Sequence, residues 1–207
     1  MGTSANGVAR QCAERANQVW CYDFVHDQTA DGRPLKFLAI EDEYTRESLA
    51  IEVSRSLTSR DVIARLQRLF AQRGAPQGIR SDSEGDQGGS PIPEFIAQAL
   101  QNWLATSPEG TLYIDAGAPW QNGHAESFHG KLRDELLNAE QFMSVLEAKV
   151  LSEQLRVEFN EERPHSALGY LTQAEFARRL RAGSATLRRP AAAEKDGPSQ
   201  TLIRTGT

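Results

Sequence analysis

The feature that most constrains the fold is a change of hydrophobic period along the chain. Three segments rich in aromatic and β-branched residues come first and are predicted as strands: residues 19–25, 34–40 and 49–53. From Val62 onward, apolar residues recur at helical spacing. Predicted helices then alternate with two further strands, at residues 78–82 and 111–114. The order β-β-β-α-β-α-β-α, followed by extra helices, predicts an α/β fold. Its five-stranded mixed sheet, three strands antiparallel and two parallel, is flanked by helices on both faces.

Capping patterns predict where three of the helices begin. In each, a hydroxyl residue precedes an acid by three positions: Thr58 with Asp61, Ser144 with Glu147, and Thr172 with Glu175. Helix ends are predicted at Gly74, before Pro164 and near Gly183. Apolar spacing alone predicts two more helices, over residues 95–104 and 125–136.

Length and composition predict one domain with polar ends. The chain has 207 residues, enough for a single core. We expect a linker at residues 1–17, the folded core at 18–183, and a disordered tail at 184–207, which is rich in Ala, Pro and Arg. No apolar run is long enough for a membrane span, and the N-terminus lacks the apolar stretch of a signal peptide, so a cytoplasmic location is expected. The net charge of −5 argues against a stand-alone nucleic-acid binder, but it is compatible with a catalytic domain that holds cations.

Asp23 is the first candidate for chemistry. Strand alternation places it on the same face as Val19, Cys21 and Val25. A carboxylate among apolar neighbours is costly unless something pairs with it. The alternative is an edge position that is open to water.

Asp82 is the second candidate, because it ends the fourth predicted strand, and ligand sites of α/β sheets gather at strand carboxyl ends. The alternative is an aspartate that merely opens a turn. The acidic, glycine-rich segment after it is not a site in itself. An EF-hand counted from Asp82 would need Gly and an acid where Gln87 and Pro93 stand, and no Gly-Lys-Ser/Thr of a nucleotide loop is present.

Glu126 is the third candidate. On a predicted helix it shares a face with His129, Gly130 and Arg133, at +3, +4 and +7. The alternative is an ordinary solvated helix face.

Taken together, the three acids and their surroundings resemble the DDE integrase core of IS3-like insertion-sequence transposases and their retroviral-integrase relatives. The matching stretches are QVWCYDFV (18–25), KFLAIEDEYTRESLAIEV (36–53), IRSD (79–82), PWQNGHAESFHGKLRDELLN (119–138) and FNEERPHSALGYLTQAEF (159–176). The resemblance covers roughly residues 15–180. The blocks around Glu126 and around Arg163–Tyr170 are specific, whereas a bare D…D…E pattern is not.

The resemblance implies an RNase H-like fold and a polynucleotidyl transferase that cleaves and transfers DNA strands. It places the catalytic, metal-binding carboxylates at Asp23, Asp82 and Glu126. Three acids suit this chemistry because two Mg²⁺ or Mn²⁺ ions about 3.5–4 Å apart can activate the attacking hydroxyl and stabilise the leaving oxygen. Both cations prefer hard oxygen ligands.

The same resemblance suggests roles for neighbouring residues. Asn122, His124 and His129 are candidates to position the scissile strand, and Lys131 and Arg133 are candidates to hold DNA phosphates. For each, the alternative is a solvated helix residue. Arg163 and His165 are interpreted as structural residues that lock the C-terminal helices onto the core.

The implied partners are the DNA of the element ends and of the target, an upstream helix-turn-helix transposase subunit or region, and further copies of the chain in a synaptic complex. No membrane partner is implied. The implied location is the bacterial cytoplasm, in association with the nucleoid.

The sequence departs from the family pattern directly after Asp82. The family's Asn-Gly-Pro-Glu-Phe is absent, and the segment up to Glu126 is longer than usual, which indicates an insertion at residues 83–93. An inactive remnant that keeps the fold and binds DNA or a transposase subunit is therefore an alternative function. A nuclease of the RNase H or resolvase kind is a third, against which the blocks at Glu126 and Arg163–Tyr170 argue.

Overall fold

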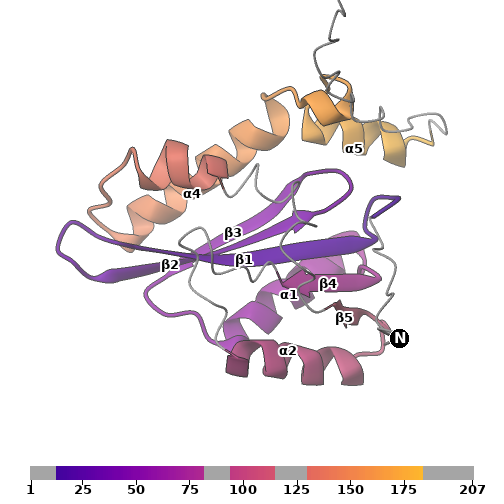
Figure 1. Cartoon of the computed structure of the whole chain (residues 1–207), viewed down its shortest axis with the longest axis horizontal. Coiled ribbons are helices and arrows are strands. Elements are labelled where there is room, and N and C mark those ends of the chain that lie inside the picture. The colour runs from indigo at the N-terminus through magenta and orange to yellow at the C-terminus, as the bar shows by residue number, and fades with distance from the viewer. Residues whose placement is uncertain (1–12, 82–93, 115–129, 184–207) are drawn as a thin grey trace, which may run out of the picture.

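The computed structural model describes residues 13–81, 94–114 and 130–183. Within these residues, five strands form one mixed sheet in the order β3-β2-β1-β4-β5 (Figure 1). The strands are β1 (Val19–Gln28), β2 (Pro34–Asp42), β3 (Ser48–Ser54), β4 (Gly78–Ser81) and β5 (Leu112–Ile114). Strands β1, β2 and β3 pair antiparallel, whereas β4 pairs parallel with both β1 and β5. The predicted α/β class and strand directions are confirmed.

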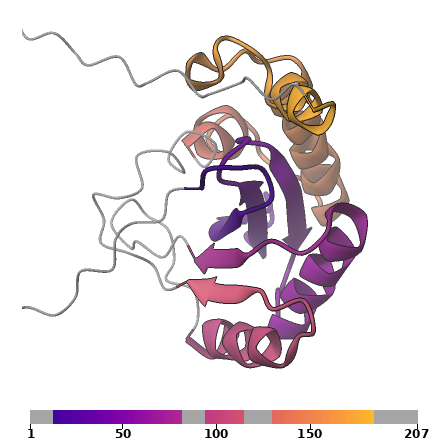
Figure 2. The same cartoon turned by 90° about the vertical axis from the view of Figure 1, so that its right-hand side faces the viewer.

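Helices cover both faces of this sheet (Figure 2). They are α1 (Ser59–Arg73), α2 (Glu94–Thr106), the π-helix η2 (Leu132–Leu137), α4 (Val145–Glu161), the 3-10 helix η3 (Ser166–Leu168) and α5 (Gln173–Arg181). The capping boxes predicted at Thr58 and Thr172 are both formed. None of the described helices combines the length and apolar character needed to cross a bilayer.

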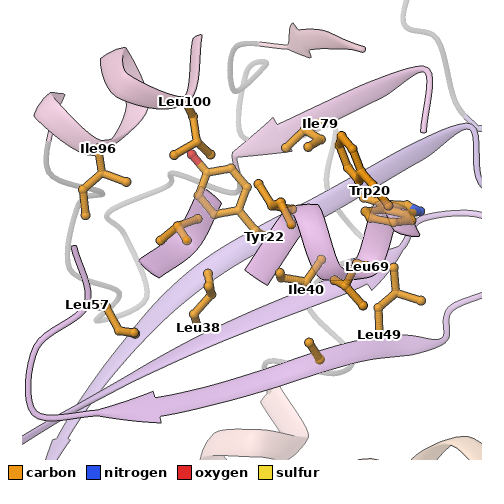
Figure 3. Packing of buried hydrophobic residues seen from close by; sticks show 14 of the residues in the cluster. Trp20, Tyr22, Leu38, Ile40, Leu49, Leu57, Leu69, Ile79, Ile96 and Leu100 are labelled. Carbon is orange, nitrogen blue, oxygen red and sulfur yellow. The ribbon is translucent and has the colours of Figure 1, made fainter. Parts of the chain in front are cut away.

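The core on one face lies between the sheet and helices α1 and α2. Trp20, Tyr22 and Phe24 of β1 point into it, as period-2 alternation requires, and all three are almost fully buried. Figure 3 shows Trp20 and Tyr22 packed among aliphatic side chains of β2, α1, β4 and α2. Hydrophobic burial on this face therefore fixes which way every β1 side chain points.

The intervening residues of β1 face the opposite side. Val25 packs in a second core with Phe37 of β2 and with Leu155 and Phe159 of α4. Val19 packs in a third cluster that includes Phe176 of α5. Asp23, which lies between them in the alternation, therefore faces the same side as α4 and α5.

One predicted cap differs in detail. The Ser144 hydroxyl accepts from the Glu147 N–H at 3.1 Å, but the Glu147 carboxylate accepts from the Met143 N–H at 2.5 Å instead of completing a capping box with Ser144. The φ of Ser144 is −153°, compared with −95° at Thr58 and −70° at Thr172. The N–H of Ser144 thus points in a different direction, and the Glu147 carboxylate accepts from the Met143 N–H instead.

Candidate functional site

Asp23 lies on the central strand of the sheet. Strand β1 lies between β2 and β4, but among the described residues Asp23 is paired only with Ala39 of β2, so the alternative of a position open to water on the β4 side stays open. The Asp23 side chain is half-buried, and its Oδ1 accepts a hydrogen bond from the Phe24 N–H at 2.7 Å. A carboxylate is therefore held on the α4 side of the sheet, where it is partly removed from water.

The described pairing of β4 with β1 leads up to two of the predicted acids. The last pair of the parallel ladder is Tyr22 with Ser81. The next residue along β1 is Asp23, and the next residue after Ser81 is Asp82. Because the strands are parallel, both chains leave this pair in the same direction. Asp82 itself lies outside the described residues.

Four other predicted site residues also lie outside the described residues: Asn122, His124, Glu126 and His129. Among the described residues, no three His, Cys, Asp or Glu side chains gather as metal ligands. Asp23 offers hard oxygen atoms in a half-buried setting, which fits Mg²⁺ or Mn²⁺ as one ligand of several. The donor type thus fits the metals that the resemblance implies, and the remaining ligands stay predictions.

Lys131 and Arg133 lie at the start of the π-helix η2. Lys131 pairs with Glu135 at 3.4 Å, and its side chain is 40% exposed. Arg133 is half-buried, and its carbonyl accepts from the Asn138 N–H five residues on, at 2.8 Å. Glu126 lies outside the described residues, so its predicted common face with Arg133 stays a prediction. Their roles in holding phosphates stay predictions.

Arg163 and His165 make contacts within the C-terminal region, and their predicted role in locking its helices onto the core stays a prediction. Arg163 forms an ion pair with Glu135 of η2 and another, at 2.7 Å, with Glu158 of α4. The hydrogen bond from Arg163 lowers the pKa of the Glu135 carboxyl. The His165 Nδ1 accepts from the Ala167 N–H at 3.3 Å, and its backbone pairs with Leu171.

The sequence interpretation missed an ion pair close to the predicted acids. Arg80 of β4 bonds Glu43, just after β2, at 2.9 Å, and the two side chains are only 12% and 16% exposed. Arg80 precedes Asp82 by two positions in a strand, so alternation gave a signal that both share a face. Glu43 gave no signal, because it is far from Arg80 in the sequence.

Two family models described as "Integrase core domain" match adjoining parts of the chain. One matches residues 13–107 and the other residues 109–172. The described strands and helices fall largely within these two ranges.

Curated relatives are proteins of bacterial insertion elements. The chain is 40% identical over 166 residues to an uncharacterized 31.7 kDa protein of insertion element IS407 from Burkholderia multivorans. It is 36% identical over 165 residues to a 39.2 kDa protein of IS476 from Xanthomonas euvesicatoria. Each match covers 80% of this chain, but 57% and 45% of the relatives, so the chain spans about half of their length.

Solved structures of integrase catalytic cores share the fold. The HTLV-2 integrase catalytic core domain in complex with magnesium aligns with a TM-score of 0.54 at 15% identity, over 78% of this chain and 96% of that one. A chain of the simian T-cell lymphotropic virus intasome aligns with a TM-score of 0.58 at 12% identity, over 95% of this chain and 63% of that one. The RNase H-like fold implied by the sequence is thereby confirmed.

Proposed function

This chain belongs to the integrase core domain family, and we propose that it is the catalytic core of an insertion-sequence transposase. The proposed activity is metal-dependent cleavage and transfer of DNA strands by Asp23, Asp82 and Glu126. The observation that carries the proposal is the parallel β1–β4 ladder, whose last described pair is Tyr22 with Ser81. Asp23 follows Tyr22 and Asp82 follows Ser81 in the sequence, which supports two neighbouring acids. Asp23 is half-buried on the α4 side of the sheet.

The chemistry follows from the donor set. Bound Mg²⁺ or Mn²⁺ supplies Lewis acidity and charge neutralisation at the phosphodiester. Asp23, Asp82 and Glu126 would together hold the metal ions through their carboxylate oxygens. Lys131, with its side chain 40% exposed, and Arg133 extend from the same segment as Glu126 and hold phosphates of the DNA backbone. Asn122, His124 and His129 position the scissile strand.

The partners are inferred from the relatives. One structural neighbour is a catalytic core in complex with magnesium, and another belongs to an intasome. For this chain we infer DNA of the element ends and target, and further copies of the chain, as partners. An upstream helix-turn-helix region or subunit recognises the element ends. The folded core at residues 18–183 acts in the bacterial cytoplasm on nucleoid DNA.

An aspartate pair on β1 gives a matched test. Asp27 lies on the same strand and face as Asp23, is also half-buried, and accepts from the next N–H at the same 2.7 Å. With Mn²⁺ and DNA carrying the element ends, Asp23→Asn is expected to abolish nicking and joining, whereas Asp27→Asn keeps both. Full activity of Asp23→Asn refutes the assignment.

The inactive remnant is the second candidate function, because the segment after Asp82 departs from the family pattern. Calorimetric titration with Mn²⁺ separates the two. Binding that is lost in Asp23→Asn and in Asp82→Asn supports an active site, and no binding by the wild-type protein supports the remnant. Preferential cleavage of RNA–DNA hybrids or junctions would instead indicate a nuclease.

A further inference from the structure

The buried ion pair between Arg80 and Glu43 spans the central strand. Arg80 pairs with Cys21 of β1, and Glu43 follows the last residue of β2 on the other side of β1. Ile79 points into the core under α1 and α2, so Arg80 points to the opposite side, the side of Asp23. The pair thus links both neighbours of β1 on the face that carries the candidate site.

The turn that carries Glu43 is itself fixed. The Glu43 N–H donates to the Val19 carbonyl at 3.0 Å. The buried Asp42 carboxylate accepts from the N–H groups of Tyr44 and Thr45, each at 2.9 Å. Arg80 is therefore bonded to a turn that is itself hydrogen-bonded to β1.

An anchor for β4 matters because few described pairs define its register. Its described residues, Gly78–Ser81, make four register pairs with β1 and three with β5. A slip of two residues keeps every side chain on its face and moves the strand by about 7 Å. Asp23 and Asp82 could not share a pair of metal ions about 3.5–4 Å apart if β4 moved by this distance. A slip would also pull Arg80 from Glu43 in a site where both are largely out of water.

We propose that Glu43 and Arg80 are positioning residues that fix the register of β4 against β1, the strand that carries Asp23, and thereby the start of the segment that carries Asp82. The proposal rests on the proposed function, since it gives Asp23 and Asp82 a shared metal site. The charges of Glu43 and Arg80 cancel, so the pair adds no net positive charge next to the acids to repel the cations.

Single neutral variants and a charge-swapped double variant test the pair. The singles are Glu43→Gln and Arg80→Gln, and the double variant combines Glu43→Arg with Arg80→Glu. Glu52→Gln is the control. Glu52 also forms two ion pairs, with Lys149 at 3.7 Å and with Arg65 at 4.0 Å, but it lies on β3. Two readouts are followed in the full chain: amide hydrogen exchange of β4 and Mn²⁺ affinity by calorimetry.

In the single variants, we expect faster exchange of the β4 amides and about 10- to 100-fold weaker Mn²⁺ binding, as for lost supports of metal ligands. The double variant restores both, and Glu52→Gln changes neither. The proposal is overturned if folded single variants show unchanged exchange of the β4 amides and unchanged Mn²⁺ affinity. A lower melting temperature without a change in either readout also overturns it. If a single variant does not fold, Glu43→Asp and Arg80→Lys replace it, with the same criteria. Faster exchange in a protein whose wild type binds no Mn²⁺ supports the positioning role and refutes the proposed function.

Discussion

Asn160 offers a sharp test of how α4 is attached to the sheet. Its buried side chain accepts from the Ser48 N–H and donates to the Ser48 carbonyl, both at 2.9 Å. Ser48 begins β3, which lies at the edge of the sheet. The side-chain amide of Asn160 thus bonds the backbone N–H and carbonyl of Ser48, as a residue of a neighbouring strand would. Asn160→Ala removes both hydrogen bonds.

The cost follows from what each Ser48 group loses. The Ser48 carbonyl keeps the Arg156 guanidinium at 3.1 Å, so its loss is about 1 kcal/mol. The Ser48 N–H loses the Asn160 acceptor, and a buried donor left unsatisfied costs about 1–3 kcal/mol. We expect Asn160→Ala to lower the free energy of unfolding by about 2–4 kcal/mol in all.

Urea unfolding followed by circular dichroism measures this change, with Asn138→Ala as the control. Asn138 is exposed, and its amide lies 3.5 Å from Asp134, so its removal should stay within about 0.5 kcal/mol. The reasoning is refuted if Asn160→Ala costs no more than this control.

Three further stability predictions concern charged groups and a cap. Glu47, with a side chain only 7% exposed, meets two arginines at 3.3 Å, so Glu47→Gln should cost about 1–3 kcal/mol in urea unfolding. Thr172→Ala removes a capping box and should cost about 0.5–2 kcal/mol in the same assay. Arg163 lowers the folded-state pKa of Glu135, so this stabilisation is present above the unfolded pKa of about 4.3 and is lost as pH falls through the lower folded value. Urea midpoints from pH 6 to pH 3 should therefore fall less steeply in Arg163→Gln than in wild type.

Sequence patterns predicted the elements because their signals are local. The alternation of Trp20, Tyr22 and Phe24 appears within a single strand, and the Thr172 cap within four residues. The position of β1 within the sheet depended instead on which strands flank it. Neighbouring strands come from distant segments, so nothing near Asp23 in the sequence indicated a central strand.

The π-helix shows a second limit. Leu132 and Leu136 are four residues apart and both buried, which fits an α-helix as well as the observed π-helix. The difference lies in the backbone, where the Asn138 N–H donates to the Arg133 carbonyl five residues earlier, and the apolar pattern carries no signal for it. Helical spacing thus predicted that a helix exists here, but not its type.

The inserted segment after Asp82 has less influence on the proposed site than its position suggests. The described part of β4 that leads to Asp82 is fixed by its own contacts. Ile79 is buried in the core, the β1–β4 ladder runs to Ser81, and Arg80 is tied to Glu43. All three constraints lie N-terminal to the insertion, so a longer connection to α2 does not remove any of them. Loop-closure entropy also grows only slowly with length. The contacts of β4 are thus compatible with an active core, and Mn²⁺ titration of Asp82→Asn against wild type decides between that function and the inactive remnant.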